Sequence, residues 1–113
     1  MRILAIDPGE KRIGIAISDP SGTIANPLTV LKHVGRAIDA AAIASLAHEN
    51  EAKLIIVGQA LDDEGNPTSQ SRRASRLAEA ISQQTNLPVQ MWDESGSTQA
   101  ARQARMAMGV SRR

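Results

Sequence analysis

Two apolar segments joined by a short polar turn open this chain, and they constrain its fold more than any other feature. Ile3–Ile6 is a continuous apolar run, a pattern typical of a strand buried on both faces. Pro8 favours an extended conformation at Asp7, so we expect a strand over 2–7 that ends on this carboxylate. A second strand is expected over 12–18, where isoleucines alternate with small residues. The short connection predicts that the two strands are antiparallel.

The rest of the chain alternates between helical and strand patterns. Asn66 is the expected N-cap of a central helix over 67–84, with Pro67 in its first turn. A continuous apolar run over 53–58 follows a helical pattern and predicts a buried parallel strand. The other expected elements are strands near 28–31 and over 89–92, and helices over 36–50, 67–84 and 98–108.

This order of elements predicts an α/β fold with a mixed five-stranded sheet and flanking helices. The first three strands have short connections and should be antiparallel, whereas the last two follow helices and should run parallel to the first. With 113 residues, the chain is expected to form a single domain over 1–113 that is large enough to bury a core.

Acidic residues lie at the ends of the strands that are expected to be parallel. The first strand ends at Asp7, and the fifth is followed by Asp93 and Glu94. Because the C-terminal ends of parallel strands share one edge of a sheet, we expect Asp7 and Glu94 to be neighbours in space. Converging carboxylates suit Mg²⁺ or Mn²⁺, and a pair of such ions can support phosphodiester cleavage. The alternatives are that Asp7 is a turn residue and that Glu94 is a favourable charge near the start of a helix.

The composition narrows the classes of ligand and of chemistry. Phe and Tyr are absent and Trp92 is the only aromatic residue, which argues against recognition of single strands by base stacking. The absence of cysteine excludes disulfides, thiolate metal sites and cysteine nucleophiles. No signal sequence and no apolar run of membrane-spanning length is present, so we expect a cytoplasmic protein.

Charge is unevenly distributed, although the formal net charge is only +1. Residues 1–65 carry six Lys or Arg and nine Asp or Glu, whereas residues 66–113 carry seven Arg and three acids. Arg72, Arg73 and Arg76 lie near the start of the expected central helix, where guanidinium groups can bind phosphate oxygens in a bidentate manner. The alternative is a solvated helix face.

Several segments together resemble the YqgF/RuvX family, and they span essentially the whole chain in the family's order. They are Asp7-Pro8-Gly9, Arg12–Asp19, Ile56-Val57-Gly58 with Gly65 and Thr68, and Asp93-Glu94 with Ser97-Thr98. The resemblance implies an RNase H-like fold and a metal-dependent endonuclease that hydrolyses phosphodiester bonds in structured nucleic acid. The implied substrate is precursor 16S rRNA, processed at its 5′ end, or alternatively a Holliday junction.

The resemblance also implies roles for individual residues. Asp7 matches the family's first-strand aspartate, and Glu94, with Asp93 beside it, matches the acidic pair after the fifth strand. Asp7, Asp93 and Glu94 are therefore the implied catalytic residues, with Asp7 and Glu94 as ligands of Mg²⁺ or Mn²⁺. The cations expected to bind structured RNA or branched DNA are Lys11, Arg12, Arg72, Arg73 and Arg76.

The chain departs from the family pattern in its C-terminal part. Ser95 and Gly96 stand where the family usually has Arg-Leu. The family normally continues into a last helix with a further aspartate, whereas no acidic residue follows Glu94 here. The acids of the loop 62–64 are candidates for a third metal ligand. A domain that lacks this last helix is expected to expose apolar surface and to form a homodimer.

Three functions are compatible with these patterns. The first is a metal-dependent nuclease, and the second is a catalytically impaired module of the same fold that still binds RNA or DNA. The third is a sugar-kinase-like or actin-like ATPase, because Asp-x-Gly on a hairpin also opens the phosphate loop of those enzymes. Chain length argues against the third function, since those enzymes need two lobes. Cleavage of nucleic acid separates the first two.

Overall fold

The computed structural model describes residues 1–21 and 25–93. Five strands and two helices are present in these residues. In chain order they are β1 (Arg2–Pro8), β2 (Arg12–Ser18), β3 (Ala25–Lys32), α1 (Arg36–Glu49), β4 (Ala52–Gln59), α2 (Ser69–Ser82) and β5 (Val89–Asp93). The helix expected over 98–108 lies outside the described residues.

The strands form one mixed sheet with the order β3-β2-β1-β4-β5. The pairs β1–β2 and β2–β3 are antiparallel, whereas β4 is parallel to both β1 and β5. The predicted α/β fold with three antiparallel and two parallel strands is therefore confirmed. β3 is longer than expected and includes Pro27, which faces Ala16 across an irregular register. An edge strand tolerates this proline because its outer side needs no ladder hydrogen bonds.

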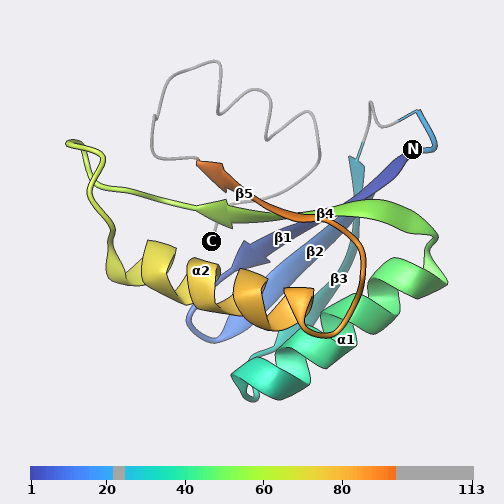
Figure 1. The fold of residues 1–113 in the computed structure, drawn as a ribbon, viewed down its shortest axis with the longest axis horizontal. Coiled ribbons are helices and arrows are strands. Elements are labelled where there is room, and N and C mark those ends of the chain that lie inside the picture. The colour runs from blue at the N-terminus through green and yellow to red at the C-terminus, as the bar shows by residue number, and fades with distance from the viewer. Residues whose placement is uncertain (22–24, 94–113) are drawn as a thin grey trace.

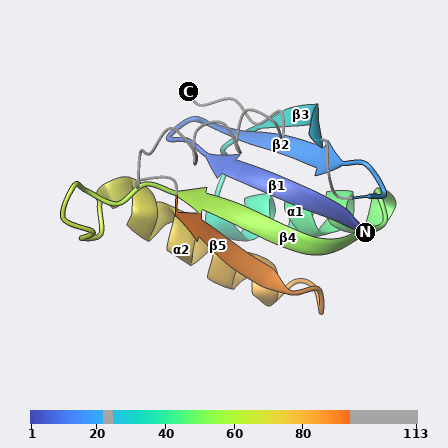
Figure 2. The same cartoon turned by 90° about the horizontal axis from the view of Figure 1, so that it is seen from above.

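The two helices lie on the same face of the sheet (Figures 1 and 2). The larger hydrophobic core fills the space between helices and sheet, and its largest fully buried side chains are Leu4, Ile6, Ile13, Ile43, Ile55, Val57 and Ile81. A smaller cluster on the opposite face contains Ala5, Ala16 and Ile56, with Trp92 packed against it. Because side chains alternate along a strand, Asp7 lies on the same face as Ala5, away from the helices.

Helix α2 begins two residues later than the sequence suggests, so the predicted Asn66 cap is wrong. Thr68 is the N-cap, and its hydroxyl accepts a hydrogen bond from the Ser71 amide at 3.0 Å in a capping box. Asn66 is instead held in the preceding loop, because its amide donates to Asp62 Oδ1 at 2.7 Å. The aspartate side chain closes a local turn and thereby removes Asn66 from the helix.

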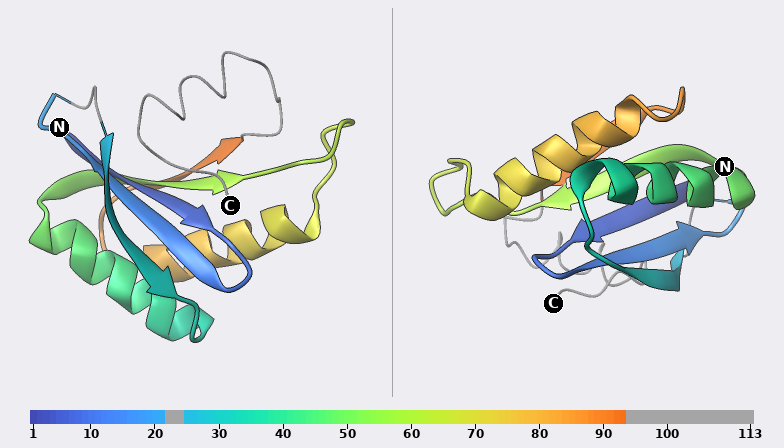
Figure 3. Two further views of the ribbon diagram at one scale, coloured as in Figure 1. Left: turned by 180° about the vertical axis from the view of Figure 1, so that it is seen from behind. Right: turned by 90° about the horizontal axis from the view of Figure 1, so that it is seen from below.

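The turn between β1 and β2 depends on close backbone packing at Gly9. The Gly9 amide donates to the Arg12 carbonyl at 2.9 Å, and a Cβ at Gly9 would lie only 2.7 Å from that oxygen. The loop from α1 to β4 lies at the other end of the strands from this turn (Figure 3).

Among the described residues, no helix is both long and apolar enough to cross a membrane.

Gly9→Ala is expected to lower the free energy of unfolding by about 1–3 kcal/mol, because the new methyl group clashes with backbone in the turn. Gly14→Ala is the matched control, since its Cβ would make ordinary contact with Asp7 Cβ at 3.6 Å. Urea denaturation followed by circular dichroism measures both variants. Equal stability of the two variants would contradict this account of the turn.

Candidate active site

Asp7 occupies the penultimate position of β1, between two glycines on the neighbouring strands. Gly14 of β2 is its antiparallel partner, and a Cβ at Gly14 would lie 3.6 Å from Asp7 Cβ. On the other side Ile6 pairs with Val57, so Gly58 of β4 comes next to Asp7. Neither neighbouring strand therefore places a side chain beside this carboxylate. In the row Gly14, Asp7 and Gly58 across these three neighbouring strands, only Asp7 has a side chain.

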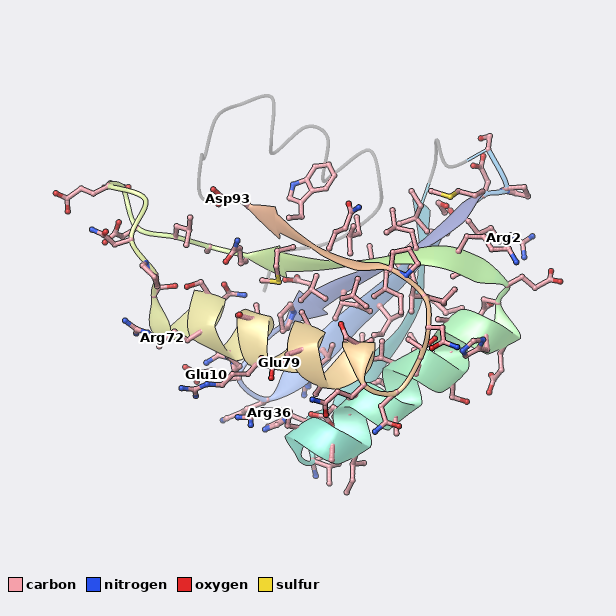
Figure 4. All side chains as sticks on the ribbon, viewed as in Figure 1. Arg2, Glu10, Arg36, Arg72, Glu79 and Asp93 are labelled. Carbon is pink, nitrogen blue, oxygen red and sulfur yellow. The ribbon has the colours of Figure 1, made fainter. Side chains whose placement is uncertain are left out.

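Asp93 ends β5 at the same edge of the sheet (Figure 4). It pairs with Gln59, so it lies two strands from Asp7, or about 10 Å at the usual strand spacing. The two carboxylates do not share a face. Trp92 packs with the cluster on Asp7's face, and alternation places Asp93 on the other face with Met91. Glu94, the second acid expected beside Asp7, lies outside the described residues.

A pocket of about 540 Å³ surrounds Asp7 and the turn that follows it. Its charged lining combines the acids Asp7 and Glu10 with the cations Lys11, Arg12 and Arg73. Lys11 lies in the turn, Arg12 begins β2 and Arg73 belongs to α2, so the β1–β2 hairpin and the helix both contribute to one hollow. We name this hollow the Asp7 pocket.

Gln70, which sequence reasoning missed, connects α2 to the strand ends. Its Oε1 accepts from the Ala60 amide at 2.6 Å, and its Nε2 donates to the carbonyls of Pro8 at 3.3 Å and Gly58 at 3.5 Å. These bonds place the first turn of α2 against the ends of β1 and β4. Arg73 lies one helical turn after Gln70 and is thereby brought to the Asp7 pocket. One indication of this contact is present in the sequence, namely that Gln70 stands three positions before Arg73 and so shares a helix face with it.

The five cations expected to bind nucleic acid are distributed unequally. Lys11, Arg12 and Arg73 line the Asp7 pocket. Arg76 lines a neighbouring pocket instead, and Arg72 lines neither of these two hollows. Residues on consecutive positions of a helix point in directions about 100° apart, which separates Arg72 from Arg73.

Within the ranges 1–21 and 25–93, no group of three or more acidic, His or Cys side chains is arranged to hold a metal ion. Mg²⁺ sites commonly use only one or two protein carboxylates and complete their shell with waters and substrate phosphates. Asp7, with glycines on both sides, fits a site of that kind. Asp62, one of the candidates for a third metal ligand, instead holds its own loop together, because its Oδ1 accepts hydrogen bonds from the amides of Glu64 and Asn66.

Comparison with known proteins gives a family for the whole chain. Residues 1–113 match the family model described as "RuvX: Holliday junction resolvase". A protein of Clostridium kluyveri named "Putative pre-16S rRNA nuclease" is 34% identical over 112 residues, which cover 99% of this chain and 82% of that protein.

Solved structures show the same fold at low sequence identity. Thermus thermophilus RuvC in complex with a Holliday junction substrate superimposes with a TM-score of 0.61 at 15% identity, over 98% of this chain and 80% of RuvC. The ROK hexokinase of the same organism superimposes with a TM-score of 0.53 at 20% identity, but only 35% of its chain is covered. Both proteins thus share the RNase H-like sheet of this chain. The fold alone does not assign the chain to a family, whereas the match to the RuvX model does. The resemblance noted in the sequence is confirmed: the chain belongs to the RuvX family.

Proposed function

We propose that this chain is a metal-dependent endonuclease that cleaves phosphodiester bonds in structured nucleic acid, with the 5′ end of precursor 16S rRNA as its substrate. The observation that carries the proposal is the Asp7 pocket, in which a carboxylate at the end of a central parallel strand lies beside three cations. Family membership and the names of the curated relatives support the nuclease reading. The proposed place of action is the cytoplasm.

The cations of the Asp7 pocket are proposed to bind the phosphate that is cleaved. Lys11 and Arg12 belong to the β1–β2 hairpin and Arg73 belongs to α2, so two different elements supply cations to the phosphate. A guanidinium group can donate two parallel hydrogen bonds to phosphate oxygens, which fixes orientation as well as position. Positive charge in these positions also stabilises the extra negative charge that develops on the phosphoryl oxygens in the transition state.

Asp7 and Glu94 are proposed to hold Mg²⁺ or Mn²⁺. When bound, such an ion supplies positive charge that polarises a phosphoryl oxygen and eases deprotonation of the attacking water. The choice of Glu94 over Asp93 follows from the position of Asp93, which lies on the opposite face of the sheet from Asp7. Asp93 then contributes charge at the edge and does not bind the ion.

Two other functions stay open as alternatives. A Holliday junction is the alternative substrate, favoured by the family description and by the fold shared with a junction-bound RuvC. A binding module with impaired catalysis is the second, favoured by the small number of carboxylates around Asp7 in the described part of the chain. The expected homodimer also stays a prediction. An apolar side chain that a partner could cover is Val30 of the edge strand β3, which is 51% exposed.

Asp7→Asn is expected to reduce cleavage of a precursor 16S rRNA fragment about 100-fold or more, because an amide is a poor ligand for a divalent ion. Cleavage is measured with Mn²⁺, with Mg²⁺ and with EDTA, on the RNA and on a four-way DNA junction. Glu79→Gln is the matched control. It neutralises an exposed acid of α2 that lines neither of the two pockets, and it should retain activity. RNA binding without cleavage by the wild-type protein would favour the impaired module.

Gly14→Val is expected to reduce kcat/KM by about tenfold or more while the fold is retained, because its methyl groups extend beyond a Cβ that already contacts Asp7. Gly14→Ala, which adds only that Cβ, should remain active. Steady-state cleavage rates and thermal melting are measured for both variants. If Gly14→Val matched the wild-type protein, the space beside Asp7 would have no part in binding substrate.

A further inference from the structure

A second hollow lies on the helix side of the same turn. It has a volume of about 420 Å³ and is lined by Arg36 at the start of α1 and by Arg73 and Arg76 of α2. Pro8, Gly9 and Arg73 line both this hollow and the Asp7 pocket. We name it the arginine pocket. Figure 4 shows Arg36 and the turn residue Glu10 at the same end of the molecule.

Cations outnumber acids in the described lining of the arginine pocket. Asp39 is the acid in its lining, and it is only 4% exposed. Its Oδ2 lies 2.5 Å from His33 Nδ1, and its Oδ1 accepts from the Val34 amide at 3.1 Å. Among residues 1–21 and 25–93, no ion pair involves Arg36, Arg73 or Arg76. Three guanidinium groups therefore line a hollow that contains a single carboxylate, and this carboxylate is hydrogen-bonded to His33 and to the Val34 amide.

A further observation indicates that a ligand with acceptor oxygens belongs here. Arg73 Nε is buried and has no hydrogen-bond partner in the described part of the chain, an arrangement that costs stability unless a ligand supplies an acceptor. Helix α1 begins beside the pocket with Gly35 as its N-cap and without a side-chain cap, and its first turn contains the acid Asp39. Helix α2, in contrast, is closed by its capping box.

We propose that the arginine pocket binds a second backbone phosphate of the nucleic acid whose scissile phosphate lies in the Asp7 pocket. This inference rests on the proposed function and adds a contact that extends the substrate footprint from one face of the sheet, around the β1–β2 turn, to the helix-covered face. Arg73 lies between the two phosphates, because it lines both pockets. Arg36 and Arg76 bind the second phosphate alone.

An extended phosphodiester backbone fits this arrangement better than a small free anion. The two hollows share the turn and Arg73, so one continuous ligand can occupy both. Arg36 and Arg76 are exposed, which suits a ligand that arrives along the surface and leaves it again. The substrate is thus a structured nucleic acid whose backbone continues past the cleaved bond, and a fragment that ends at that bond makes only half of the contacts.

The test is the salt dependence of nucleic-acid binding by an Arg36→Ala/Arg76→Ala variant. A labelled RNA duplex with a single-stranded extension and a four-way DNA junction are titrated in EDTA at several KCl concentrations. Each lost phosphate contact reduces the slope of log K against log salt by about one. The double variant is expected to reduce the magnitude of this slope by about one and to weaken binding about tenfold at low salt.

Arg2→Ala/Lys53→Ala is the matched control, because it removes the same charge at the starts of β1 and β4, the opposite end of these strands. It should leave the slope nearly unchanged. Arg36→Lys/Arg76→Lys keeps both charges and should restore the slope. Thermal melting verifies that all variants fold. A slope for Arg36→Ala/Arg76→Ala equal to that of the matched control, with either nucleic acid, would overturn the proposal.

Failure of this inference can be told apart from failure of the proposed function. Binding is measured in EDTA and does not depend on cleavage. If the wild-type protein never cleaves but the arginine variant lowers the slope, the second phosphate contact stands and the nuclease proposal falls. If cleavage depends on Asp7 but the slope does not depend on Arg36 and Arg76, the nuclease proposal stands and the arginine pocket has no such role.

Discussion

The pairing of β1 with β2 and β4 is the constraint on which the rest of the structure depends. Leu4 and Ile6 of β1 pack with Ile55 and Val57 of β4 beneath the helices, and this burial fixes the register. A slip by one residue would move these side chains to the other face, so the register is strongly specified. The same register leaves Asp7 between two glycines. Core packing thus determines the surroundings of the carboxylate.

Helix α2 is the second element that the site requires. Gln70 ties its first turn to the carbonyls at the ends of β1 and β4, and Arg73 follows one turn later. Because Arg73 lines both hollows, the position of a single helix sets the cation next to Asp7 and one wall of the arginine pocket. Pro8 and Gly9 at the β1–β2 turn line both hollows, and Gly9 permits that turn to close tightly. The two hollows at this edge of the sheet are therefore adjacent, as the proposed path for phosphates requires.

The sequence predicted the sheet well because its signals are local. Apolar runs such as 53–58 and short connections between strands specify topology without knowledge of distant contacts. The start of α2 was misplaced, because the side chain of Asp62 captures Asn66 in a loop whose geometry no propensity encodes. Arg36 and Gln70 were missed for a related reason. Their partners lie on distant segments, so only the folded chain shows that they meet the turn after β1.

Asp7, in its glycine-flanked position, is proposed to be the centre of a divalent-cation site. Paramagnetic broadening of backbone amide signals by Mn²⁺ tests it most directly, since the effect falls steeply with distance and needs no substrate. Broadening is expected to be strongest around Asp7, Gly14 and Gly58 and to be lost in Asp7→Asn. Broadening centred on the acids of the loop 62–64, or unchanged in Asp7→Asn, would contradict it.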